Sequence, residues 1–155
     1  MHGFKEMNAE SSVRVAITMA NSEACLSGDK YIEPFHILLA ILNIVDDHYY
    51  QAAESIGLTP EAIKLVGETG AQCRSQLKIS DKEITAIRRQ LHKILRGREA
   101  PVPLHMLGYS NESTYLLQKA ARRSLNRGVN ELQLTTMLEE LLENLPKEIA
   151  SFLGR

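Results

Sequence analysis

Four basic side chains recur along one side of a predicted helix and could bind an anion. They are Arg88, Arg89, Lys93 and Arg96, with His92 among them. Guanidinium and ammonium groups bind phosphates and carboxylates, so this stripe is a candidate patch for phosphate or an acidic partner. A solvated helix face is the ordinary explanation of such a run. Nucleic acid is a less favoured ligand, because no aromatic residues that could stack on bases are interleaved.

Enzymatic chemistry would need a nucleophile, a base or a phosphate-binding loop in a recognisable context. Serine, histidine and aspartate occur, but no Gly-x-Ser-x-Gly elbow surrounds a serine. Cys73 precedes Arg74, whose charge would lower the pKa of the thiol, yet no base accompanies the pair. No Gly-x-x-x-x-Gly-Lys-[Ser/Thr] loop is present. We therefore expect no enzyme and no cofactor.

Two further sets of residues could ligate a metal ion. His36 lies in an apolar segment, but no Cys, Asp or Glu accompanies it at ligand spacing. We expect a buried core histidine with one N–H bonded to a carbonyl. Asp46-Asp47-His48 are adjacent at a predicted helix end, where their side chains diverge. We expect these three residues to be solvated, and no metal site.

Pro34 begins the element around which the chain is organised. The run from Ile37 to Val45 is apolar on all sides, which predicts a central helix contacted from several directions. Proline is favourable there because its missing N–H would be unpaired in the first turn anyway. A buried strand is the alternative, but the apolar run is long for one.

Further helices are predicted on both sides of this central one. Asn8 caps a first helix that ends at Gly28. A short helix covers His48 to Ile56, and Thr59-Pro60 opens another. That last helix is expected to weaken at its two glycines, Gly67 and Gly70.

The second half of the chain is also predicted to be helical. Ser80-Asp-Lys-Glu83 is a capping box that opens an amphipathic helix over 81–95, and Glu99-Ala-Pro-Val-Pro103 is a linker. Ser110 caps a helix that Gly128 ends, and Pro146 starts a last one. Since no segment alternates apolar and polar residues over strand length, the predicted fold class is all-α.

The two halves of the chain align when shifted by a hundred positions. Each half has a capped helix, a glycine, a short loop, an apolar helix and then a short helix. The matched pairs are Ile17 and Leu117, Ala20 and Ala120, Gly28 and Gly128, Ile32 and Leu132, and Ile41 and Leu141. Two similar helical units packed about a pseudo-twofold axis explain this pattern, because neither unit can bury its apolar face alone.

The bulk composition limits the class of protein. The 155 residues fit one domain, and 44% hydrophobic with 24% charged residues is ordinary for a soluble globular protein. A net charge of -1 gives no case for a nucleic-acid or membrane partner. The two cysteines form no disulfide framework, and no signal peptide or membrane-spanning run is found. We expect a cytoplasmic protein.

The residues from Tyr31 to Leu42 carry a resemblance to a known family. Tyr-Ile-Glu-Pro-Phe-His-Ile-Leu-Leu-Ala-Ile-Leu resembles the Tyr-Ile-Gly-Thr-Glu-His-Leu-Leu-Leu-Ala-Leu-Leu signature of the Clp ATPase amino-terminal domain. The segment 109–120 resembles the opening of that family's second repeat, and 55–63 is similar to its Leu-Gly-Val-Asp-x-x-Ala-Leu segment. The resemblance implies a double repeat of a four-helix unit. Repeat one would cover about 8–70, a longer helical insert and linker about 78–105, and repeat two about 107–154.

Two departures from the family pattern bear on function. The Thr-Glu-His trio becomes Pro34-Phe35-His36 in one half and Leu134-Thr135-Thr136 in the other. In some Clp regulators the acidic residue there helps recognise phosphorylated arginine, and since Phe35 and Thr135 are uncharged we do not carry that activity over. In the first half, the short helix is followed by Leu58-Thr-Pro-Glu, which opens a further helix. The second half reaches Arg155 at the equivalent point, so the second unit is expected to lack its last helix.

The resemblance implies a module that binds substrate proteins, adaptors or a partner helix for an unfoldase or protease. A Clp ATPase or protease ring would then be a partner in cis or in trans. Two alternatives stay open: a stand-alone accessory protein docking on a Clp complex, and a secretion-system Clp ATPase domain that binds a sheath-protein helix. The expected binding groove lies at the junction of the units, the other interpretation being apolar staples on the helix starts. Its candidate residues are Phe4, Met7, Phe35, Leu104, Leu107, Tyr109 and Thr135.

Overall fold

The computed structural model describes residues 8–96, 100–145 and 150–151, and these residues are mostly helical. The all-α prediction is confirmed at this level. Phe4, Met7 and most of the helix predicted from Pro146 lie outside the described residues. The helices are α2 (Ser11–Leu26), α3 (Pro34–Val45), α4 (Tyr50–Ser55), α5 (Pro60–Leu77), α6 (Asp81–Arg96), α7 (Asn111–Asn126) and α8 (Leu134–Glu143). The strands are β1 (Asn8–Ala9), β2 (Tyr31–Ile32), β3 (Gly108–Tyr109) and β4 (Glu131–Leu132).

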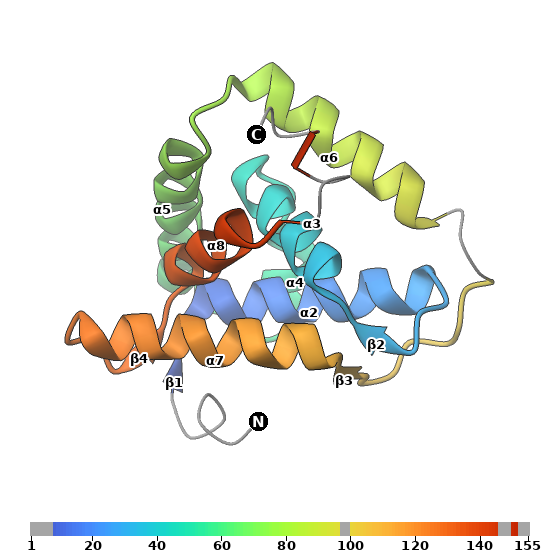
Figure 1. The fold of residues 1–155 in the computed structure, drawn as a ribbon. Helices are drawn as coiled ribbons and strands as arrows, with labels where there is room; N and C mark the ends of the chain where they lie inside the picture. The colour runs from blue at the N-terminus through green and yellow to red at the C-terminus, as the bar shows by residue number, and fades with distance from the viewer. Residues whose placement is uncertain (1–7, 97–99, 146–149, 152–155) are drawn as a thin grey trace.

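Helix α3 occupies the centre of the molecule, as predicted from its sequence. Every residue from His36 to Val45 is buried. Helices α2, α5, α6, α7 and α8 all pack against it, and Figure 1 shows α3 enclosed between α6 on one side and α2 and α7 on the other. Each fully buried Leu or Ile side chain stabilises the fold by about 1.5–3 kcal/mol, so the buried residues of α3 contribute strongly to stability.

The four short strands within the described residues, which the sequence did not predict, join the two halves of the chain. Strand β1 pairs in parallel with β4, and β2 pairs in parallel with β3. Asn8 lies opposite Glu131 in one pair, and Tyr31 lies opposite Gly108 in the other. A shift of a hundred positions converts one register into the other. Two-residue strands are too short to show the alternation by which a strand is predicted.

The first helix begins later than predicted. Asn8 lies in β1, and Glu10 is the N-cap of α2, although its side chain makes no capping hydrogen bond there. Its carboxylate instead accepts a hydrogen bond from the N–H of Leu134 at 2.8 Å, in the first turn of α8. The carboxylate thereby satisfies a helix donor that would otherwise lack an intrahelical partner. Glu10 therefore links the two halves beside the β1–β4 pair.

The region after α3 also differs from the prediction. Helix α4 begins at Tyr50 rather than His48, because Asp47 adopts a left-handed conformation with φ of 61°. Helix α5 continues through Gly67 and Gly70 to Leu77 without weakening. A Cβ at Gly67 would lie 2.7 Å from the Tyr49 hydroxyl oxygen, and one at Gly70 would lie 3.2 Å from the side chain of Ile44. The glycines thus allow close packing, which offsets their cost of about 1 kcal/mol each in a helix.

Helix α6, the predicted insert, packs on the central helix rather than standing away from it. Ile84, Leu91 and Leu95 are buried along one side, and α6 lies against α3 and α2. At the end of α3, the Asp46 carboxylate accepts hydrogen bonds from the Thr85 hydroxyl and from Arg88 Nε, both at 2.7 Å. Asp46 is therefore not the solvated residue that the sequence suggested.

This contact predicts a dependence of stability on pH. Burial would raise the pKa of Asp46, but hydrogen bonds from Thr85 and Arg88 and the charges of Arg88 and His48 outweigh burial and lower that pKa below its ordinary 3.8. A lowered folded-state pKa gives stability that is present above pH of about 4 and is lost as the pH falls through the lowered value. We expect Asp46→Asn to lower the free energy of unfolding by about 1–3 kcal/mol at pH 7. Urea unfolding at a series of pH values should show that the stability of the variant falls less steeply in acid than that of the wild type.

The neighbouring Asp47→Asn variant is the matched control, because Asp47 is exposed and Asn tolerates the left-handed conformation. It should keep the wild-type pH profile. A profile that is unchanged in Asp46→Asn would contradict this role for Asp46.

Candidate functional site

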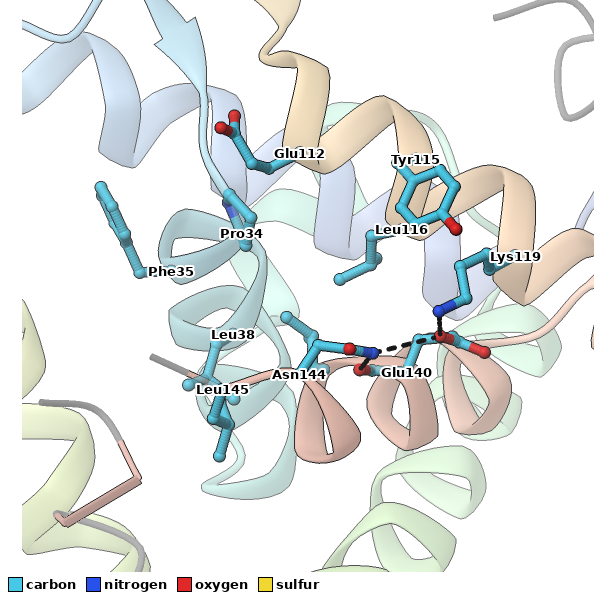
Figure 2. Close-up of a pocket in the computed structure, with 11 residues that line it drawn as sticks. Pro34, Phe35, Leu38, Glu112, Tyr115, Leu116, Lys119, Glu140, Asn144 and Leu145 are labelled. Carbon is cyan, nitrogen blue, oxygen red and sulfur yellow. Dashed lines mark hydrogen bonds and ion pairs between the residues drawn. The ribbon is translucent and has the colours of Figure 1, made fainter. Parts of the chain in front are cut away.

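A pocket of about 200 Å³ lies where α3 of the first half meets α7 and α8 of the second. Figure 2 shows Pro34, Phe35 and Leu38 on one side of it and Leu116 opposite. The remaining lining residues are Glu112, Tyr115, Lys119, Glu140, Leu141, Asn144 and Leu145. Most of the wall is apolar, so the pocket favours an apolar side chain over a small polar metabolite.

The α3 side of the pocket is held in place by His36. This side chain is fully buried, as predicted. Its Nδ1 accepts a hydrogen bond from the Glu33 N–H at 2.9 Å, and because an N–H can only donate, the ring proton lies on Nε2. Nε2 then donates to the Asp29 carboxylate at 2.8 Å. The predicted carbonyl partner is therefore wrong: the turn after α2 brings a carboxylate to the ring instead. The ring of Phe35 packs edge-on against His36, with centroids 4.7 Å apart.

The opposite wall contains a buried carboxylate. Glu140 is 2% exposed, receives a hydrogen bond from Arg123 and has Lys119 Nζ at 3.3 Å. The Asn144 side-chain amide donates to the Glu140 backbone oxygen at 3.0 Å. The Lys119 ammonium also lies 5.1 Å from the centre of the Tyr115 ring, within cation–π range. These contacts fix the polar wall in one arrangement.

Removing Arg123 should destabilise the α7–α8 pair. Arg123 also binds Glu139 and Glu143, so Arg123→Ala leaves Glu140 with Lys119 as its remaining cation. We expect a loss of about 1–3 kcal/mol in the free energy of unfolding, less than for a fully stranded buried charge. Denaturant unfolding measures this loss. The adjacent Arg122→Ala is the control: Arg122 is exposed and should change stability by less than about 0.5 kcal/mol. Equal effects of the two substitutions would contradict the assigned role.

The predicted groove residues that the structure describes lie in several places. Phe35 lines the pocket, but Thr135 is half-buried in the first turn of α8, where its carbonyl accepts from Gln76. Leu104 is 73% exposed and lines a separate shallow hollow beside α2 and α4. Leu107 and Tyr109 are half-buried near β3. Phe35 and Leu104 therefore line different hollows, and a groove shared by the whole set stays a prediction.

The segment before β3 runs along α2, because Asn21 holds it there. The Asn21 amide donates to the His105 carbonyl, and its oxygen accepts from the Leu107 N–H, both at 2.9 Å. Sequence inspection missed Leu38, Leu116 and Leu141 as pocket residues, since they belong to ordinary apolar helix stripes. Tyr115, exposed and aromatic beside such a stripe, was the available signal.

The basic stripe of α6 is largely engaged within the protein. Arg88 is bound to Asp46, and Arg96 binds the Glu23 carboxylate through two nitrogens at 3.1 and 3.2 Å. Arg89 and Lys93 are exposed. Arg88 and Arg96 are therefore balanced by carboxylates of the protein, and the remaining two charges, on Arg89 and Lys93, are what an ordinary solvated helix face carries.

The structure also bears on a reactive cysteine, a metal site and a membrane span. Burial and the charge of Glu10 raise the pKa of the Cys73 thiol to about 12, so the neighbouring Arg74 does not lower that pKa below its ordinary value. Across residues 8–96, 100–145 and 150–151, no cluster of three or more His, Cys, Asp or Glu side chains could hold a metal ion. Within the same ranges, no helix has the length and apolar character that crossing a membrane requires.

Comparisons with known proteins do not assign the chain to a family. No protein-family model matches it, and no curated protein matches it either.

Proposed function

We propose that this chain is a protein-binding module of the Clp amino-terminal-domain type, which captures a partner protein for an unfoldase or protease. The pocket between α3, α7 and α8 carries the proposal. It is apolar, it is open to solvent, and it is built from both halves of the chain. Such a pocket suits an anchoring side chain of a partner protein, because buried apolar anchors supply most of the binding energy at protein interfaces.

The internal repeat supports a double-repeat arrangement of this type. Helices α2 and α7 begin at Ser11 and Asn111, and α3 and α8 begin at Pro34 and Leu134. Gly28 and Gly128 follow the first helix of each half with φ of 72° and 77°. The two strand pairs keep the same offset of a hundred positions. Two related units packed about a pseudo-twofold axis account for all of these matches.

The mechanism is binding alone. Phe35 stands where the family signature has an acidic residue, so an apolar side chain lines the pocket at the position of that acid. The partner is a substrate, an adaptor or a helix of a Clp-linked assembly, and the chain acts in cis or in trans of the ATPase ring. A partner would be held by apolar burial and oriented by the polar wall around Lys119 and Glu140.

The test is affinity capture from cell extract by the full chain and by a Tyr115→Asp variant, read by mass spectrometry. Tyr115 is 63% exposed at the pocket, so the change alters the site without emptying the core. Leu65→Asp, 56% exposed on α5 and outside the pocket, is the control. We expect a defined set of proteins, including a Clp subunit or adaptor, to be retained by the wild type and the control and lost by Tyr115→Asp. Identical capture by all three chains would contradict the proposal.

A further inference from the structure

One charged side chain at the pocket makes no ion pair with the residues that the structure describes. The Glu112 carboxylate lies at the pocket edge beside Pro34, at the start of α7 (Figure 2). Glu112 is exposed, and its carboxylate has no hydrogen-bond or ion-pair partner among residues 8–96, 100–145 and 150–151. The other lining carboxylate, Glu140, already has Lys119 and Arg123 as cations. Among the described residues, the charge at the pocket that lacks an ion-pair partner is therefore negative, and it lies at the pocket edge.

The size of the pocket limits what can enter it. A cavity of about 150 Å³ accommodates benzene, so the 200 Å³ here has room for one large apolar side chain. Its apolar wall is formed by Pro34, Phe35, Leu38 and Leu116. Whatever flanks the entering side chain must stay at the mouth, where Glu112 is.

We propose that the occupant is a partner-protein segment with one large apolar residue flanked by Lys or Arg, the apolar side chain entering the pocket and the cation pairing with Glu112. This inference rests on the proposed function and adds the class of segment that is recognised. Glu112 acts on specificity: the apolar anchor supplies affinity, and the carboxylate selects among segments that carry such an anchor.

The test uses the full chain and short fluorescent peptides with a common Gly/Ser background. The central residue is Leu or Ala, and its flanking residues are Lys, Gln or Glu. Each peptide is named by its central and then its flanking residue, so Leu/Lys has a central Leu flanked by Lys. Fluorescence polarisation should rank Leu/Lys above Leu/Gln and Leu/Gln above Leu/Glu, with steps of roughly two- to fivefold, the scale of an exposed ion pair. Ala/Lys should bind at least about tenfold more weakly than Leu/Lys. In Glu112→Gln the differences among the three Leu peptides should collapse.

The control variant is Glu61→Gln. Like Glu112, Glu61 is an exposed acid in the first turn of a helix, but it lies on α5 outside the pocket. It should keep the wild-type ranking. Equal binding of the three Leu peptides to the wild type would overturn the selectivity and leave the proposed function standing. Equal binding of Ala/Lys and Leu/Lys, or no binding of any peptide, would overturn the pocket as the site.

Discussion

Replacing Leu145 by aspartate is expected to weaken binding of a partner segment by about ten- to a hundredfold. Leu145 is half-buried and lines the pocket just after α8. A carboxylate there would face the entering apolar side chain, whose burial is worth about 1.5–3 kcal/mol. Each 1.4 kcal/mol corresponds to a tenfold change in affinity. Titration of the Leu/Lys peptide into wild-type and variant chains by fluorescence polarisation measures this loss.

Two controls accompany this measurement. Leu65→Asp introduces the same charge on α5, outside the pocket, and should bind as the wild type does. Circular dichroism should give both variants the wild-type helix content, because neither change removes a fully buried side chain. Retained affinity in a folded Leu145→Asp protein would mean that the partner binds elsewhere.

Truncating Leu39 to alanine should cost about 2–5 kcal/mol in the free energy of unfolding. Leu39 is 0% exposed near the middle of α3, so the substitution removes buried methyl groups and leaves a cavity among several helices. Since a single domain commonly has about 5–15 kcal/mol in total, this loss is a large share of the stability. Chemical denaturation followed by circular dichroism measures it.

The same truncation at Leu65, 56% exposed on α5, is the matched comparison and should change stability by less than about 0.5 kcal/mol. Because α3 contacts helices of both halves, Leu39→Ala should still unfold in one transition. A biphasic curve, with one half melting before the other, would contradict α3 as a shared core.

The sequence predicted the helices well where one strong physical signal determined them. Pro34 followed by an apolar run specified a buried central helix, and apolar residues on one side and basic residues on the other over 81–95 specified an amphipathic one. Gly28 and Gly128 marked helix ends because each adopts a positive φ. These signals are local, so no other part of the chain was needed to interpret them.

The sequence failed where distant residues determine the outcome. Gly67 and Gly70 suggest a weak helix until the close approach of Tyr49 and Ile44 is known. Arg88 suggests a solvated charge until Asp46, at the far end of α3, is seen to bind it. The pocket also depends on residues far apart in the sequence. Leu38 and Leu116 look like any core leucine, and they line a cavity only because α3, α7 and α8 meet there.

The most direct test of the central claim is photo-crosslinking in cells from a benzoylphenylalanine placed at Tyr115. That position is exposed at the pocket, and Leu65 provides an equally exposed comparison on α5. If the pocket binds a partner protein, crosslinks from position 115 should give discrete adducts with another protein, and the Leu145→Asp change should remove them. Adducts that are the same from positions 115 and 65, or that persist with Leu145→Asp, would contradict the claim that this pocket is the binding site.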